Sequence, residues 1–130
     1  MKDLEYAQTM LTQANKDFKA LLNMLDETLF EPEIFGFHAQ QTIEKALKAW
    51  LSFLGVVCPK THDLEMLFAL LEDNKVPIPD QFRSLTDFTD FAVQFRYEAF
   101  TDFSDDDFDR QNIVSTIGAF IQYVKEQTGG

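Results

Sequence analysis

The sequence predicts an all-α protein, an up-and-down antiparallel bundle of four to five helices. Apolar residues recur at steps of three and four over most of the chain, which is the spacing of a helix that buries one face. No segment shows the alternation of apolar and polar residues that is typical of a half-buried strand. The breaks between the periodic segments are short, and short connections favour antiparallel neighbouring helices.

The length and composition are those of one globular domain. The chain has 130 residues, of which 45% are hydrophobic and 25% are charged, so it is long enough to bury a core without disulfides or bound metal. We therefore expect residues 1–130 to form a single domain. The 14 phenylalanines predict that much of its core is aromatic.

Two long helices are predicted in the first half of the chain. The first is expected from about residue 3 to 28, with Asp3 as its N-cap, and Pro32 marks the break that follows. The second is expected from about residue 33 to 54, where Gly55 can end it. One side of this second helix carries the apolar residues Phe35, Ala39, Ile43, Ala46, Trp50 and Phe53. A polar stripe, which we interpret as a solvated side, carries His38, Gln41, Lys45, Lys48 and Ser52.

The second half predicts further helices separated by turn signals. Thr61 can cap a third helix, "HDLEMLFALLED", and "NKVPIPD" breaks the chain after it. A fourth helix is expected from about residue 79 to 99 on the spacing of its phenylalanines. In "TDFSDDDFD", Ser104 and Asp107 resemble a capping box at the start of the last helix, which ends near "QTGG".

The charge balance argues against broad nucleic-acid binding. The formal net charge is −11, and a phosphate polymer is repelled by such a surface unless the cations are gathered in one place. A local pocket for one nucleotide is compatible with this charge. The chain has a single cysteine, no signal-peptide apolar run and no apolar stretch of about 18 residues. We therefore expect a soluble, cytoplasmic protein that does not bind membranes.

The sequence offers no pattern for a metal, a cofactor or a nucleophile. Neither His38 nor His62 follows a glutamate by three residues, as the metal sites of helical bundles require. The acidic run at 105–109 lacks the glycine and distal glutamate of a calcium loop. No glycine-rich phosphate loop occurs, and Cys58 is interpreted as an unreactive thiol. We expect no catalytic residue, no metal and no cofactor.

Several polar residues have both an ordinary and a functional interpretation. His38, Gln41 and Lys45 stand on successive helical turns, and an imidazole, an amide and an ammonium can together bind a base or a phosphate. By spacing alone they form a solvated face. By their i,i+4 spacing, Glu44 and Lys48 are likewise expected to form an ordinary surface ion pair, which stabilises a helix by roughly 0.2–0.5 kcal/mol.

Together these segments resemble the HEPN domain family, the higher eukaryotes and prokaryotes nucleotide-binding domains, over about residues 3 to 125. The most specific part is a Phe-His-x-x-Gln-x-x-Glu-Lys-x-x-Lys-Ala run, matched by Phe37, His38, Gln41, Glu44, Lys45, Lys48 and Ala49. The His-Asp-Leu of residues 62–64 and the Arg-Tyr of 96–97 match later landmarks of the family. Family members commonly continue Arg-Tyr-Pro, whereas this chain has Glu98.

The resemblance implies a helical bundle that is usually a homodimer. Small prokaryotic members are often encoded beside a minimal nucleotidyltransferase and act with it as a toxin–antitoxin-like pair. On this interpretation the chain is a non-catalytic module that binds an ATP-like nucleotide and the nucleotidyltransferase. Its candidate ligand-binding residues are His38, Gln41, Lys45, His62, Arg96 and Tyr97. In that set Lys45 and Arg96 would neutralise phosphate, and the others would orient the ligand, with Tyr97 stacking on it or donating its hydroxyl.

Two alternatives stay open. Other HEPN proteins are metal-independent ribonucleases that carry an arginine followed four to six residues later by a histidine, but both histidines here precede all three arginines. A ribonuclease would therefore need a displaced pair, His62 and Arg96, with the histidine as general acid or base. The other alternative is a homodimeric module that binds only protein, with Phe37 or Trp50 as an interface hot spot.

Overall fold

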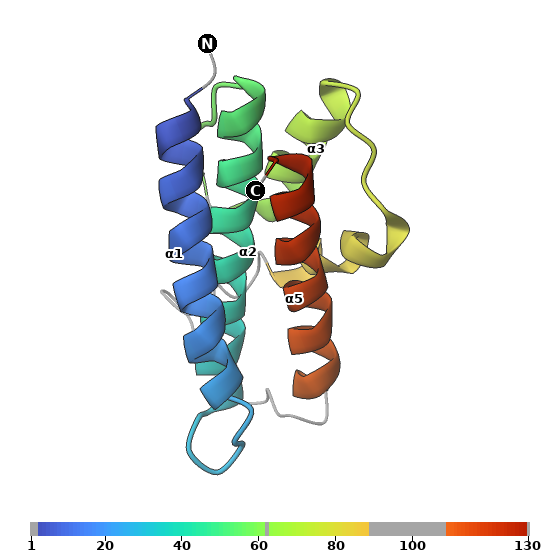
Figure 1. Cartoon of the computed structure of the whole chain (residues 1–130). Coiled ribbons are helices and arrows are strands. Elements are labelled where there is room, and N and C mark those ends of the chain that lie inside the picture. Colours follow the sequence, from blue (N-terminus) through green and yellow to red (C-terminus); the bar gives the residue numbers. More distant parts are fainter. Residues whose placement is uncertain (1–2, 62, 89–108, 130) are drawn as a thin grey trace.

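The computed structural model describes residues 3–61, 63–88 and 109–129 (Figure 1). The elements in chain order are α1 (Leu4–Asn23), α2 (Pro32–Leu54), α3 (Leu64–Asp73), the 3₁₀ helix η1 (Asp80–Phe88) and α5 (Arg110–Gln127). Figure 1 shows α1 and α2 as an antiparallel hairpin, with α5 alongside α2. No strand occurs within the described ranges, so the predicted all-α bundle is confirmed.

The central element is α2, which packs against α1, α3, η1 and α5. The predicted apolar side of this helix is confirmed, because Phe35, Ala39, Ile43 and Ala46 are 0% exposed and Trp50 is 1% exposed. On this apolar side, aromatic rings from α2, α5 and η1 pack against one another. The ring centroids of Trp50 and Phe120 are 6.4 Å apart, and those of Phe120 and Phe82 are 5.1 Å apart. The expected aromatic core therefore exists and joins α2, α5 and η1.

Three of the four predicted ends of the first two helices are confirmed. The Asp3 carboxylate accepts a hydrogen bond from the backbone N–H of Tyr6 at 2.9 Å, and Gly55 ends α2 with φ of 78°. Pro32 begins α2. The prediction that the first helix reaches residue 28 is wrong, because α1 ends at Asn23. Beyond this end, Asp26 accepts bonds from the backbone and hydroxyl of Thr28, a local turn that competes with the helix.

Later boundaries differ more from the prediction. Asp63, not Thr61, is the N-cap of α3 and accepts from the backbone N–H of Glu65 at 3.0 Å, while Thr61 accepts from the N–H of Asp63. The expected α-helix from 79 to 99 begins as the 3₁₀ helix η1, and residues 89–99 lie outside the described ranges. Prolines at 77 and 79 remove donors just before it.

The start of α5 is fixed by two residues that the sequence analysis did not single out. Asp109 is its N-cap and accepts from the N–H of Asn112 at 3.2 Å, whereas the predicted capping pair, Ser104 and Asp107, lies outside the described residues. The next residue, Arg110, is 3% exposed. Its guanidinium donates to the carbonyls of Met24 and Phe30 at 2.6 and 2.8 Å. Arg110 therefore ties the α1–α2 connection to α5.

Candidate functional site

The predicted wet side of α2 is only partly exposed to solvent. Every residue from 32 to 54 is buried or partly buried, including the stripe of His38, Gln41, Lys45, Lys48 and Ser52. The cause is tertiary, because α1 covers one side of this helix while α3, η1 and α5 cover the others. The stripe is therefore a partly covered face, less exposed than the predicted solvated side.

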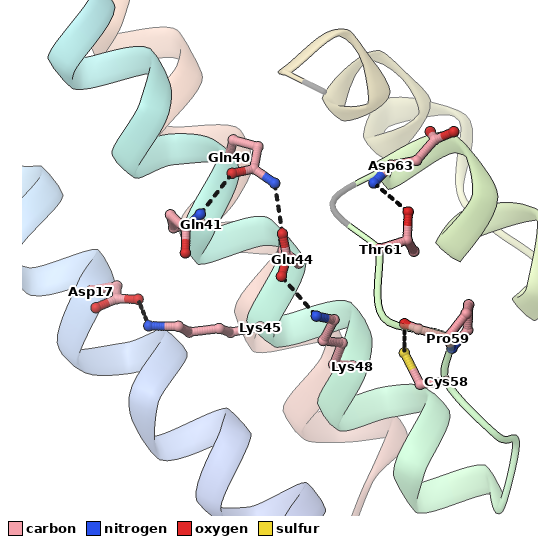
Figure 2. A network of polar contacts seen from close by, with 10 residues as sticks. All are labelled: Asp17, Gln40, Gln41, Glu44, Lys45, Lys48, Cys58, Pro59, Thr61 and Asp63. Carbon is pink, nitrogen blue, oxygen red and sulfur yellow. Dashed lines mark hydrogen bonds and ion pairs between the residues drawn. The ribbon is translucent and has the colours of Figure 1, made fainter. Parts of the chain in front are cut away.

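A chain of polar side chains runs along the side of α2 that faces the loop of residues 58–61 (Figure 2). The side-chain amide of Gln41 donates to Gln40 Oε1 at 3.1 Å, and the side-chain amide of Gln40 donates to Glu44 Oε1 at 2.7 Å. The ammonium of Lys48 donates to Glu44 Oε2 at 2.8 Å. We call these four residues the α2 network. Gln40 and Glu44 are 0% and 5% exposed, so both carboxylate oxygens of Glu44 are used inside the fold.

The burial of Glu44 corrects the interpretation of its pair with Lys48. Their side chains are only 6% and 17% exposed, so this i,i+4 contact is not ordinary surface chemistry. A buried carboxylate is tolerated only where cations and donors replace its lost water. Sequence spacing contains a signal for this burial: Gln40 and Glu44 each precede a fully buried leucine, Leu47 and Leu51, by seven residues and share its face.

Lys45 points away from the α2 network and toward α1 (Figure 2). Its ammonium lies 2.6 Å from Asp17 Oδ2, and the two side chains are 27% and 28% exposed. This ion pair joins the first two helices across 28 residues of chain. Sequence analysis did not single out Asp17, because nothing in the local pattern of α1 shows which helix it faces.

The remaining candidate residues divide into two groups. His38 is partly buried, and its ring meets the ring of Phe37 edge-on at 5.7 Å between centroids. His62, Arg96 and Tyr97 lie outside the described residues. Of the six candidates, the structure thus places Gln41 in the α2 network and Lys45 beside it in a separate ion pair.

Cys58 lies near the same network but is not activated by it. Burial raises the pKa of the Cys58 thiol, Glu44 adds to this effect, and Lys48 opposes it. A raised pKa favours the protonated, unreactive thiol over the thiolate. This shift is opposite in direction to the lowering of the pKa that activates a catalytic cysteine.

The described part of the chain was also searched for metal-binding groups and for membrane-spanning helices. Within residues 3–61, 63–88 and 109–129, no group of three or more His, Cys, Asp or Glu side chains is arranged to hold a metal ion. In the same part of the chain, no helix has both the length and the apolar character needed to cross a membrane.

Comparison with known proteins identifies the family of this helical bundle. A sequence model of the HEPN domain matches residues 7–127, so the chain belongs to the HEPN domain family. Its fold is similar to the crystal structure of ST0689, an archaeal HEPN homologue, with a TM-score of 0.67 and 22% sequence identity over 98% of this chain and 99% of that chain. At that identity the likeness concerns the fold. A search of curated protein sequences found no significant match.

Proposed function

We propose that this HEPN protein is a non-catalytic nucleotide-binding and interaction module that acts with a nucleotidyltransferase in a toxin–antitoxin-like pair. The observation that carries the proposal is the position of Gln41 and Lys45, one turn apart on α2 and both partly exposed. An amide that donates and accepts, beside an ammonium, suits a base and a phosphate. Any reaction would belong to the partner, because no arginine in the chain has a histidine downstream.

The test is calorimetric titration with ATP at low salt. We expect the wild type to bind more tightly than about 1 mM, which is roughly −4 kcal/mol, and a Lys45→Ala/Arg96→Ala variant to lose this binding. The control is Lys75→Gln/Lys125→Gln, which removes the same number of positive charges at positions outside the candidate site. Equal loss in both variants would point to general electrostatics and count against the site.

The partner is tested by co-expression with a nucleotidyltransferase encoded next to this chain. We expect the two proteins to co-purify and to elute together on size exclusion. Separate elution at micromolar concentration would contradict the proposed pairing, whatever the outcome of the ATP titration.

The ion pairs favour one second candidate, a homodimeric module that binds only protein. Lys45 and Lys48 already have carboxylate partners in Asp17 and Glu44, which reduces their value as phosphate ligands. The prediction of Trp50 as an interface hot spot is wrong, because Trp50 lies in the core and is only 1% exposed. Phe37 is only partly buried and remains the candidate for this role. This candidate predicts a dimer that Phe37→Glu dissociates, measured by light scattering, and no heat with ATP.

A further inference from the structure

We propose that Asp17 is an internal competitor of the nucleotide phosphate for Lys45 and so sets the affinity of the nucleotide site. The inference rests on the proposed function, because it concerns the cation assigned there to phosphate. It adds a residue from a different helix, and it predicts that removing an acid strengthens anion binding.

The geometry places a carboxylate where a phosphate oxygen would bind. Asp17 Oδ2 is 2.6 Å from Lys45 Nζ, at the short end of charge-assisted hydrogen bonds. Carboxylate and phosphate oxygens are both anionic acceptors for an ammonium, which binds as a point charge with three donors. While the ion pair is formed, the Asp17 carboxylate therefore binds the Lys45 ammonium that a nucleotide phosphate would need.

The exposure of this pair makes it accessible to a solute. The side chains of Lys45 and Asp17 are 27% and 28% exposed, against 17% and 6% for Lys48 and Glu44. Partly exposed pairs are weak and screened by salt, whereas a buried pair is held by the loss of water around it. A phosphate can thus displace Asp17 from Lys45 without disturbing the contact between Lys48 and Glu44.

The two lysines of the stripe consequently have different tasks. Lys48 compensates the buried carboxylate of Glu44 and belongs to the fold. Lys45 bridges to α1 through a contact that solvent reaches, so it is the cation available for ligand exchange (Figure 2). Binding of an anion at Lys45 would open the link to Asp17.

The experiment compares ATP with adenosine, which has the same base and no phosphate, by calorimetry at low salt. The proteins are the full-length wild type, Asp17→Asn, Lys45→Ala, the double variant, and Glu27→Gln as a control that removes an exposed acid from the α1–α2 connection. We expect Asp17→Asn to bind ATP between about twofold and fivefold more tightly, as loss of a weak ion pair allows. Adenosine affinity should not change, and the gain should vanish in the double variant.

The outcomes separate this inference from the function on which it rests. If Lys45→Ala loses ATP but Asp17→Asn binds it as the wild type does, the competition is overturned and the nucleotide site stands. An equal gain in Glu27→Gln would also overturn it, because net charge would then be the cause. If no protein binds ATP, both the inference and the nucleotide site fail. Asp17→Ser, which also removes the carboxylate, replaces Asp17→Asn if circular dichroism shows that the latter is unfolded.

Discussion

Glu44 is a carboxylate that the fold buries and then satisfies from its own helix. It is 5% exposed, and it accepts from Gln40 on one oxygen and from Lys48 on the other. Desolvation of a charge costs several kcal/mol unless partners compensate it. The contact is therefore more important to the folded state than to any ligand, and removal of one partner should be costly.

We predict that Glu44→Ala lowers the free energy of unfolding by about 3 kcal/mol, because it leaves the Lys48 ammonium and the Gln40 amide without this acceptor. The measurement is urea denaturation followed by circular dichroism. The control Glu27→Ala removes an exposed carboxylate and should change stability by less than about 0.5 kcal/mol. A loss below about 1 kcal/mol for Glu44→Ala would show that water reaches this carboxylate.

At the scale of elements, the approach of α5 to α1 depends on one glycine. A Cβ added at Gly118 would lie 2.9 Å from Cζ of Phe18, closer than carbon atoms pack. Phe18 is partly buried and packs against the core, so its ring would have to leave this packing to make room. The pair therefore sets how closely the two helices lie.

We predict that Gly118→Val destabilises the protein by about 2 kcal/mol through this overpacking. Phe18→Ala removes the ring that the new side chain meets, so Gly118→Val should cost much less in that background. The measurement is a double-mutant cycle by urea denaturation, which isolates the coupling between the two positions. Additive costs would mean that the valine is accommodated without pressing on Phe18.

At the scale of the whole molecule, one core joins all the described elements. Residues of α1, α2, α3, η1 and α5 contribute to a continuous cluster of buried apolar side chains. Trp50, the only tryptophan of the chain, is 1% exposed within it and lies 5.6 Å from the ring of Tyr123. Its fluorescence therefore reports on the packing of α2 against α5.

We predict that the chain unfolds as one cooperative unit, as expected for a single domain of this size. Trp50 fluorescence and far-ultraviolet circular dichroism should give the same urea midpoint. Glu126→Gln, a change at an exposed position on α5, serves as a control that should leave the two curves coincident. Midpoints that separate would indicate a second folding unit and contradict the expected single domain.

The sequence by itself determined the all-α class, the apolar side of α2 and the caps at Asp3 and Gly55. These features depend on helical periodicity and on the conformational preference of single residues, which are local properties. The run from Phe37 to Ala49 also carried enough pattern to indicate the HEPN family. Boundaries were less certain where a nearby side chain competes for the backbone, as at Asp26 and Asp63.

Only the tertiary structure decided the state of the polar stripe. Spacing placed Gln41, Lys45 and Lys48 on one side of a helix, but packing by neighbouring helices determined that none of them is fully exposed. It also gave Lys45 a partner 28 residues away in Asp17 and put Glu44 inside the fold. Such contacts join residues far apart in sequence, and no local pattern specifies which surfaces will meet.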